Sequence, residues 1–120
     1  MELKLLIALQ SAGVDTEGAL RRFAGNSALY ERFLLRFPAD ENFDKIGKAM
    51  EGEDWETMLA AAHTLKGVSG NLGMNRLFEA CSHTVTFLRQ EDIAGAKESY
   101  QALKKAYTEI CAVLEQIGEN

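Results

Sequence analysis

The sequence has little proline and little cysteine for its length. Its 120 residues include one proline, Pro38, and two cysteines, Cys81 and Cys111. An all-β fold needs many turns, so a single proline argues against one. The cysteines form neither a C-x-x-C pair nor a zinc-binding spacing. We therefore interpret them as reduced core thiols of an intracellular protein.

Long apolar runs and an excess of basic residues are also absent. The apolar run at residues 5–9 is far shorter than the ~20 residues of a membrane-spanning helix. Glu2 stands where a secretory signal carries a basic residue. With 13 basic and 18 acidic residues the net charge is −5, whereas nucleic-acid binding needs a basic face. We expect a cytoplasmic protein that binds neither membranes nor nucleic acid.

What the sequence does contain is apolar residues spaced three and four apart, which is typical of amphipathic helices. Short helices are expected over about residues 2–11, 15–23 and 26–37, with a break at Pro38. Four further helices follow: one ending at Gly52, one capped by Asp54, one over about residues 75–90 and one capped by Asp92. Their links are short, roughly two to four residues, which favours antiparallel neighbours.

We therefore predict an all-α fold, an antiparallel up-down four-helix bundle with short additional N-terminal helices. The length suits one domain over residues 1–120. In this interpretation the N-terminal helices cover about residues 2–37 and the bundle core about residues 39–117. A monomer is expected.

One histidine lies off the core face of the helix capped by Asp54. At ~100° per residue, the core stripe of this helix contains Trp55, Met58, Ala62, Leu65, Ser69 and Leu72. A second flank, roughly 140–160° away, contains Glu56, Ala60, His63, Gly67 and Gly70. Each glycine costs a helix interior about 1 kcal/mol relative to alanine. The glycines would leave the histidine ring uncovered, but periodicity alone favours a glycine-rich helix end beside an ordinary surface histidine.

The residues around this histidine resemble the motif of a known family. His63-Thr64-Leu65-Lys66-Gly67, followed by Ser69 and Leu72-Gly73, is similar to the motif of histidine phosphotransfer (HPt) domains. These domains carry phosphoryl groups in two-component phosphorelays. The resemblance also includes Gly52-Glu53-Asp54-Trp55 and, upstream, Val14-Asp15, Ala19-Leu20, Arg22-Phe23 and Gly25-Asn26. It covers roughly residues 5–115 of the chain.

The resemblance implies a phosphoryl carrier without kinase activity of its own. His63 would accept a phosphoryl group from a receiver-domain aspartyl phosphate and pass it to the aspartate of another response regulator. Imidazole suits this role because it offers a neutral nucleophilic nitrogen at cellular pH. Lys66 would offset the phosphoryl charge, Gly67 would leave room for the group, and Gly70 would extend the opening for the receiver.

The resemblance also implies which partners and cofactors to expect. The partners would be response-regulator receiver domains and a hybrid histidine kinase. Magnesium would belong to the receiver, so we expect no metal and no cofactor in this chain. Apolar residues of the N-terminal helices that do not pack inward, namely Leu3, Ile7, Ala8 and Val14, would either dock the receiver or simply cap the bundle.

One position departs from the family pattern. Some family members hold the inner ring nitrogen with a glutamine on the following helix, and by spacing that position is Val85, which cannot form a hydrogen bond. His83 is interpreted as a surface residue. Lys48 and Arg76 are further candidates for offsetting phosphoryl charge, and nothing in the sequence ranks them.

Three other functions deserve comparison. A histidine-kinase dimerisation fragment would carry an acidic residue after the histidine and a nearby proline, and Thr64 does not fit that pattern. A metal-binding bundle would need ligand pairs on facing helices, whereas Glu79 and His83 have no companions in the sequence. A non-phosphorylated helical adaptor remains open, and it predicts that changing His63 alters nothing.

Overall fold

The computed structural model of the chain describes the backbone of residues 1–118 and the side chains of residues 1–116. Residues 119–120, the end of the expected domain, lie outside the described residues. Seven α-helices occupy the described part, with a 3₁₀ turn at Phe37–Ala39 after the third. They are α1 (Leu3–Ser11), α2 (Thr16–Arg22), α3 (Ser27–Arg36), α4 (Asn42–Glu51), α5 (Trp55–Asn71), α6 (Asn75–Arg89) and α7 (Ile93–Gly118).

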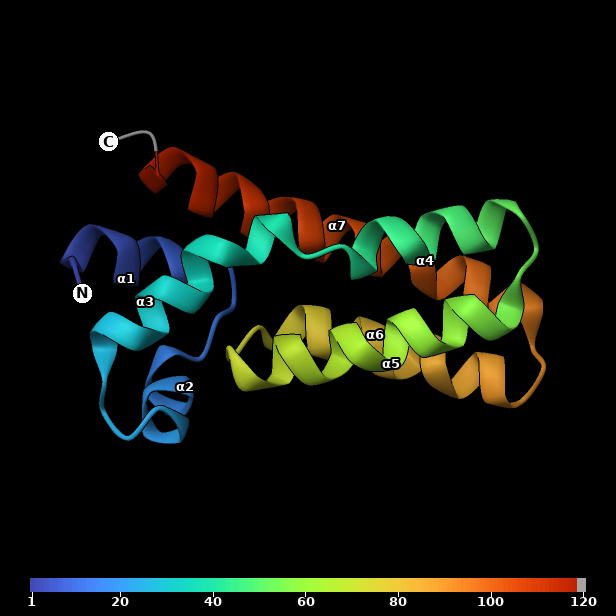
Figure 1. Ribbon diagram of the computed structural model, residues 1–120, viewed down its shortest axis with the longest axis horizontal. Helices are drawn as coiled ribbons and strands as arrows, with labels where there is room; N and C mark the ends of the chain where they lie inside the picture. The colour runs from blue at the N-terminus through green and yellow to red at the C-terminus, as the bar shows by residue number, and fades with distance from the viewer. Residues whose placement is uncertain (119–120) are drawn as a thin grey trace.

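The last four helices form the bundle. Helix α5 packs against α4 and α6, and α7 packs against α6 and α4. Successive helices run in opposite directions, and α1, α2 and α3 gather at one end (Figure 1). There α1 and α3 pack against α7. The predicted all-α class, with an up-down bundle and extra N-terminal helices, is confirmed. No described helix is both long enough and apolar enough to cross a membrane.

Local capping signals set where the helices begin. The carboxylate of Asp15 accepts a hydrogen bond from the Gly18 amide at 3.0 Å. Asp54 accepts one from the Thr57 amide at 3.1 Å, and Asp92 accepts one from the Gly95 amide at 2.9 Å. Each bond satisfies an amide that has no partner within its own helix. The predicted helix starts at these three aspartates are confirmed, as is the break at Pro38, where the 3₁₀ turn replaces the helix.

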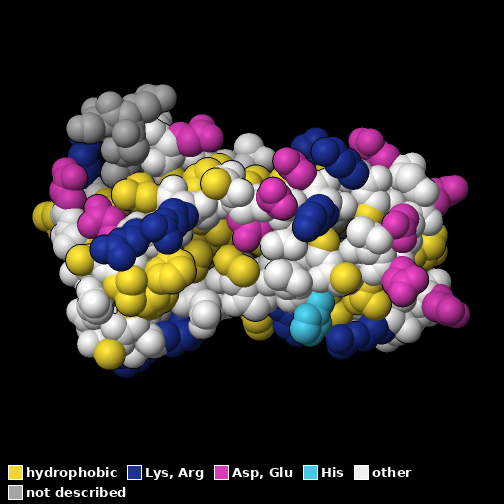
Figure 2. All heavy atoms as spheres, in the orientation of Figure 1, with side chains coloured by type: hydrophobic (Ala, Val, Ile, Leu, Met, Phe, Trp, Pro, Cys, Tyr) yellow, Lys and Arg dark blue, Asp and Glu magenta, His cyan; other side chains and the backbone are white. Residues whose placement is uncertain are grey.

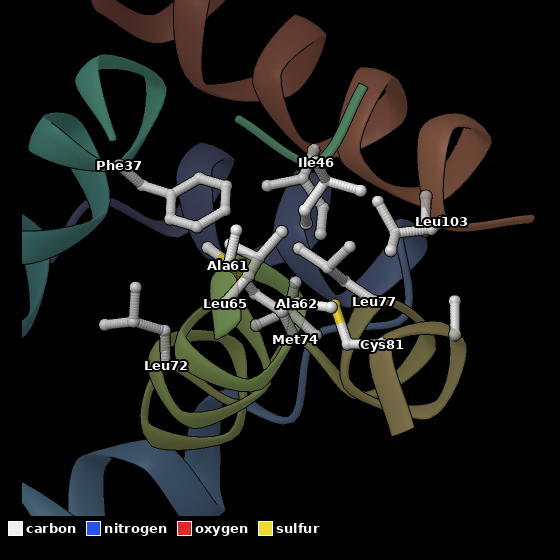
Figure 3. Packing of buried hydrophobic residues seen from close by; sticks show 14 of the residues in the cluster. Phe37, Ile46, Ala61, Ala62, Leu65, Leu72, Met74, Leu77, Cys81 and Leu103 are labelled. Atoms are coloured by element: carbon white, nitrogen blue, oxygen red, sulfur yellow. The ribbon is translucent and has the colours of Figure 1, made fainter. Parts of the chain in front are cut away.

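The core stripe predicted for α5 faces the bundle interior. Met58, Ala62, Leu65, Ser69 and Leu72 are buried, and Trp55 is half-buried. Figure 3 shows Ala62 and Leu65 of α5 beside Leu77 and Cys81 of α6, with Ile46 of α4 and Leu103 of α7 above them. Cys81 is buried, Cys111 is half-buried, and both are free thiols. Because its inner face is committed to the core, α5 presents its other flank to solvent.

The turn between α5 and α6 attaches the N-terminal helices to the bundle. The amide of Asp15 donates to the carbonyl of Gly73 at 2.8 Å, and the hydroxyl of Tyr30 donates to the carbonyl of Leu72 at 2.8 Å. Burial raises the pKa of Tyr30 to about 12, so its hydroxyl remains a donor at cellular pH. Gly73 has a φ of +75°, and a Cβ there would clash with the carbonyl oxygen of Asp15. The end of the histidine helix is therefore a structural junction.

Val14 belongs to this junction and not to the outer surface. It forms an isolated antiparallel bridge with Met74 and is only 4% exposed. The expectation that Val14 is a candidate for receiver docking is therefore wrong. The bridge to Met74 turns its side chain into the core, where it is removed from water.

Candidate functional site

His63 lies near the middle of α5 and points away from the core. It is exposed, as are Ala60 and Gly67, the residues one turn away on the same flank. Figure 2 shows histidine atoms at the molecular surface over α5. Among the described residues, the His63 ring makes no hydrogen bond or ion pair. The part of the predicted flank around His63 is thus solvent-facing, and the imidazole ring is open to a reactant.

The two glycines of this flank have different surroundings. A Cβ placed on Gly67 would meet no side chain or neighbouring helix within 4 Å in the described part of the chain. A Cβ on Gly70 would lie 3.0 Å from Cδ2 and 3.2 Å from Cε2 of Phe78. This corrects the expectation for Gly70: the space left by its missing side chain is filled by an aromatic ring from α6. The open position beside His63 is Gly67.

Lys66 is half-buried and turns toward α6. Its Nζ lies 5.7 Å from the centroid of the Phe78 ring. Among the described residues, no carboxylate lies within ion-pair distance of this ammonium. The lysine therefore carries a charge that no acidic side chain of the described residues neutralises, and this charge can compensate an anion that arrives at the exposed flank.

The other two basic candidates are not brought together with His63 by any described contact. Arg76 lies in the first turn of α6, where its Nη1 lies 3.9 Å from Oε2 of Glu109 on α7. Its side chain also covers Gly13. Lys48 is exposed in the last turn of α4. Arg76 is thus committed to the α6–α7 side and to the N-terminal segment, so Lys66 is the better-placed cation.

Val85 lies in the hydrophobic core and is 1% exposed. It therefore cannot present a group to the His63 ring. His83 is exposed on α6, in agreement with its interpretation as a surface residue. Within the described residues, no group of three or more histidine, cysteine or acidic side chains is placed to hold a metal ion. Glu79 and His83 accordingly have no companion ligands there.

A shallow hollow between α4 and α5 borders the histidine flank. It is lined by Asn42, Lys45, Thr57, Ala60, Ala61 and Thr64. The sequence pattern does not indicate this hollow, because it depends on how α4 is positioned beside α5.

Phe78 is a second residue near the site that the sequence pattern did not predict. The sequence feature that could have indicated it is an aromatic residue one turn into α6. An antiparallel α6 brings that position beside the glycines near the end of α5.

The family comparison agrees with this arrangement. A family model described as "Hpt domain" matches residues 34–116 of the chain. The match spans the end of α3, the 3₁₀ turn and nearly all of the four-helix bundle, including the His63 flank. Helices α1 and α2 lie outside it. No curated protein and no solved structure shows a significant match to the chain.

Proposed function

Because the chain belongs to the Hpt domain family, whose members transfer phosphoryl groups through a histidine in phosphorelays, we propose that His63 is the phosphorylated residue. In this proposal His63 accepts the group from an aspartyl phosphate of one receiver domain and returns it to the aspartate of another. The chain is then a carrier, and it depends on its partners for both the source and the destination of the group.

One observation carries the proposal. His63 is exposed and unpartnered among the described residues, with open space at Gly67 one helical turn away. Lys66 follows three residues after His63, and its ammonium has no carboxylate partner in the described part of the chain. Phosphoryl transfer needs little covalent chemistry beyond alignment of the nucleophile with the leaving group and compensation of charge. A free nitrogen with open space beside it permits that alignment.

The transfer step is balanced without any further reactant. A ring nitrogen of His63 forms a bond to phosphorus while the bond between phosphorus and the aspartate oxygen breaks, and the carboxylate leaves. Onward transfer reverses this with the second receiver. We propose that magnesium and the acidic residues that hold it belong to the receiver domain, as membership of the Hpt domain family implies.

The test is to incubate the chain with receiver domains that carry radiolabelled phosphoryl groups. The expected result is label on the chain that is labile in acid and stable in alkali, as a phosphorus–nitrogen bond is. Label that appears with ATP alone would point to a kinase fragment. Failure to accept label from every receiver tested would favour the non-phosphorylated adaptor.

Gly67→Ala should separate stability from transfer. The new methyl group meets no neighbouring side chain or helix, so the helix should gain up to about 1 kcal/mol of stability. Transfer should slow, because the methyl group enters the space that the phosphoryl group and the receiver would occupy. Denaturant unfolding and the initial rate of labelling measure the two effects. A variant that is more stable and transfers at the normal rate would refute this role for Gly67.

We further propose that exposed apolar side chains of α1 contribute to receiver docking. Leu3 is 70% exposed and Ile7 is 55% exposed, while Ala8 is half-buried. Figure 2 shows hydrophobic side chains at the surface of the end where α1, α2 and α3 lie. Exposed apolar side chains that gather on one face are a common feature of protein interaction sites.

Ile7→Glu tests this docking surface. The variant should weaken receiver binding about 3- to 30-fold, as loss of a modest interface contact of roughly 1–2 kcal/mol would, and it should leave helicity unchanged. Ala94→Glu is the matched control, since Ala94 is exposed at the start of α7, at the opposite end of the bundle from α1 (Figure 1). Titration of a receiver followed by fluorescence measures the affinity. Equal weakening in both variants would mean a general charge effect.

A further inference from the structure

We propose that Phe78 is a positioning residue that holds the Lys66 ammonium in a resting place away from His63, and that a phosphoryl group on His63 draws the ammonium off the ring. The inference rests on the proposed function, because Phe78 would influence phosphorylation of His63 through Lys66. Three features of the described structure support it.

The first feature is that the ring of Phe78 is seated on a glycine. Its edge lies so close to Gly70 that any side chain there would meet it at 3.0 Å. Phe78 is half-buried in the first turns of α6, against the last turns of α5. Gly70 thus provides a flat place on α5 for the ring. This contact gives the second glycine of the flank a structural reason that does not involve the receiver.

The second feature is that the ammonium of Lys66 points at this ring. Its Nζ lies 5.7 Å from the ring centroid, within the range of a cation–π interaction. Lys66 has no carboxylate partner among the described residues. Burial raises the pKa of the Cys81 thiol on α6 to about 12, and the positive charge of Lys66 acts against that rise. Both observations place the charge on the α6 side of the helix.

The third feature is the position of the ring along α5. Gly70, which seats the ring, is one helical turn beyond Lys66, whereas His63 is one turn before it. Side chains on an α-helix lean toward its N-terminus. Without the ring, the Lys66 side chain would therefore lean toward His63. Phe78 draws it toward the opposite turn, so the lysine has two alternative positions.

The two positions differ in the group that the ammonium contacts, which is the Phe78 ring in one and the phosphoryl group in the other. A phosphoryl group on His63 offers charge-assisted hydrogen bonds, which are stronger than a partly exposed cation–π contact. The ammonium should leave the ring when the group arrives. When the ammonium leaves, its contact with the Phe78 ring is lost. The phosphorylated form is therefore less favoured than it would be if Lys66 had no ring contact in the resting chain. An exposed cation–π contact corresponds to a shift of about two- to fivefold in this equilibrium.

The experiment compares Phe78→Leu with the wild-type chain, each with Lys66 intact and with Lys66→Met. The equilibrium constant for phosphoryl exchange between the chain and one receiver is measured. Phe78→Leu should shift it about two- to fivefold toward the phosphorylated chain, and it should have no effect once Lys66 is methionine. Phe78→Tyr keeps the ring and should behave as wild type. An equal shift in the Lys66→Met background would overturn the inference, because Phe78 would then act through packing alone.

A spectroscopic measurement follows the lysine itself. The ε-methylene protons of Lys66, assigned by their loss in Lys66→Met, should show an upfield ring-current shift that Phe78→Leu removes. Phosphorylation of His63 by phosphoramidate, which needs no receiver, should reduce the same shift. An ε-methylene signal that phosphorylation leaves unchanged would overturn the inference while the proposed function stands. If phosphoramidate and receivers both fail to label the chain, the proposed function falls and the inference falls with it, even where the resting chain shows the ring-current shift.

Discussion

Replacing His63 with glutamine is expected to abolish phosphoryl labelling of the chain. Glutamine is close to histidine in size and is a good helix former. His63 is exposed and makes no described hydrogen bond, so the fold should be unchanged. The amide of glutamine is not a nucleophile, so no phosphorus–nitrogen bond can form at this position. Label should fall to the background of a reaction without the chain.

His83→Gln is the matched control for this experiment. The sequence contains two histidines, and His83 is likewise exposed and helical. The control variant should accept label at the wild-type rate. Circular dichroism would verify that both variants keep their helices. Label of equal amount on the His63→Gln variant would assign the phosphoryl group elsewhere and refute the proposed role of His63.

The largest effect on stability is expected for Gly73→Ala. Alanine at a φ of +75° costs about 1–2 kcal/mol. Its Cβ would also clash with the Asp15 carbonyl oxygen and lie 3.2 Å from the Cβ of Ala19. A backbone atom cannot move aside like the end of a flexible side chain, so overpacking adds about 1–3 kcal/mol. The free energy of unfolding should fall by about 2–5 kcal/mol in total.

Gly25→Ala separates the two parts of this cost. Gly25 has a similar φ of +77°, but a Cβ there would meet no other atom within 4 Å in the described part of the chain. Its variant should lose only the conformational part, about 1–2 kcal/mol. Urea unfolding of both variants gives the comparison. Equal losses in the free energy of unfolding would show that the backbone around Gly73 accommodates the methyl group with no further loss of stability.

The features that could be predicted from sequence are those set by near neighbours in the chain. The caps at Asp15, Asp54 and Asp92 act within three residues, so the residue types alone indicated them. The buried and exposed faces of α5 follow from one helical period. The His63 flank was predicted correctly for the same reason, because it requires only that α5 be a regular helix with its apolar stripe inward.

The features that could not be predicted depend on contacts between distant segments. Val14 is an apolar residue between two short helices, and the sequence does not show whether such a residue is buried. Its burial depends on the bridge to Met74, which is distant in the chain. Gly70 lies on the same face as Gly67, and only the register of α6 against α5 puts Phe78 beside one glycine and not the other. A helical wheel treats each helix alone, so it cannot separate an open glycine from one that seats a ring.

The attachment of the N-terminal helices at the α5–α6 turn has a consequence for partner choice. Both carbonyls that hold them, those of Leu72 and Gly73, belong to the main chain, and one of the two donors is also a backbone amide. Substitutions among the exposed side chains of α1 and α3 therefore leave these bonds in place. Such changes can alter the exposed surface of the N-terminal helices while His63 keeps its position relative to that surface.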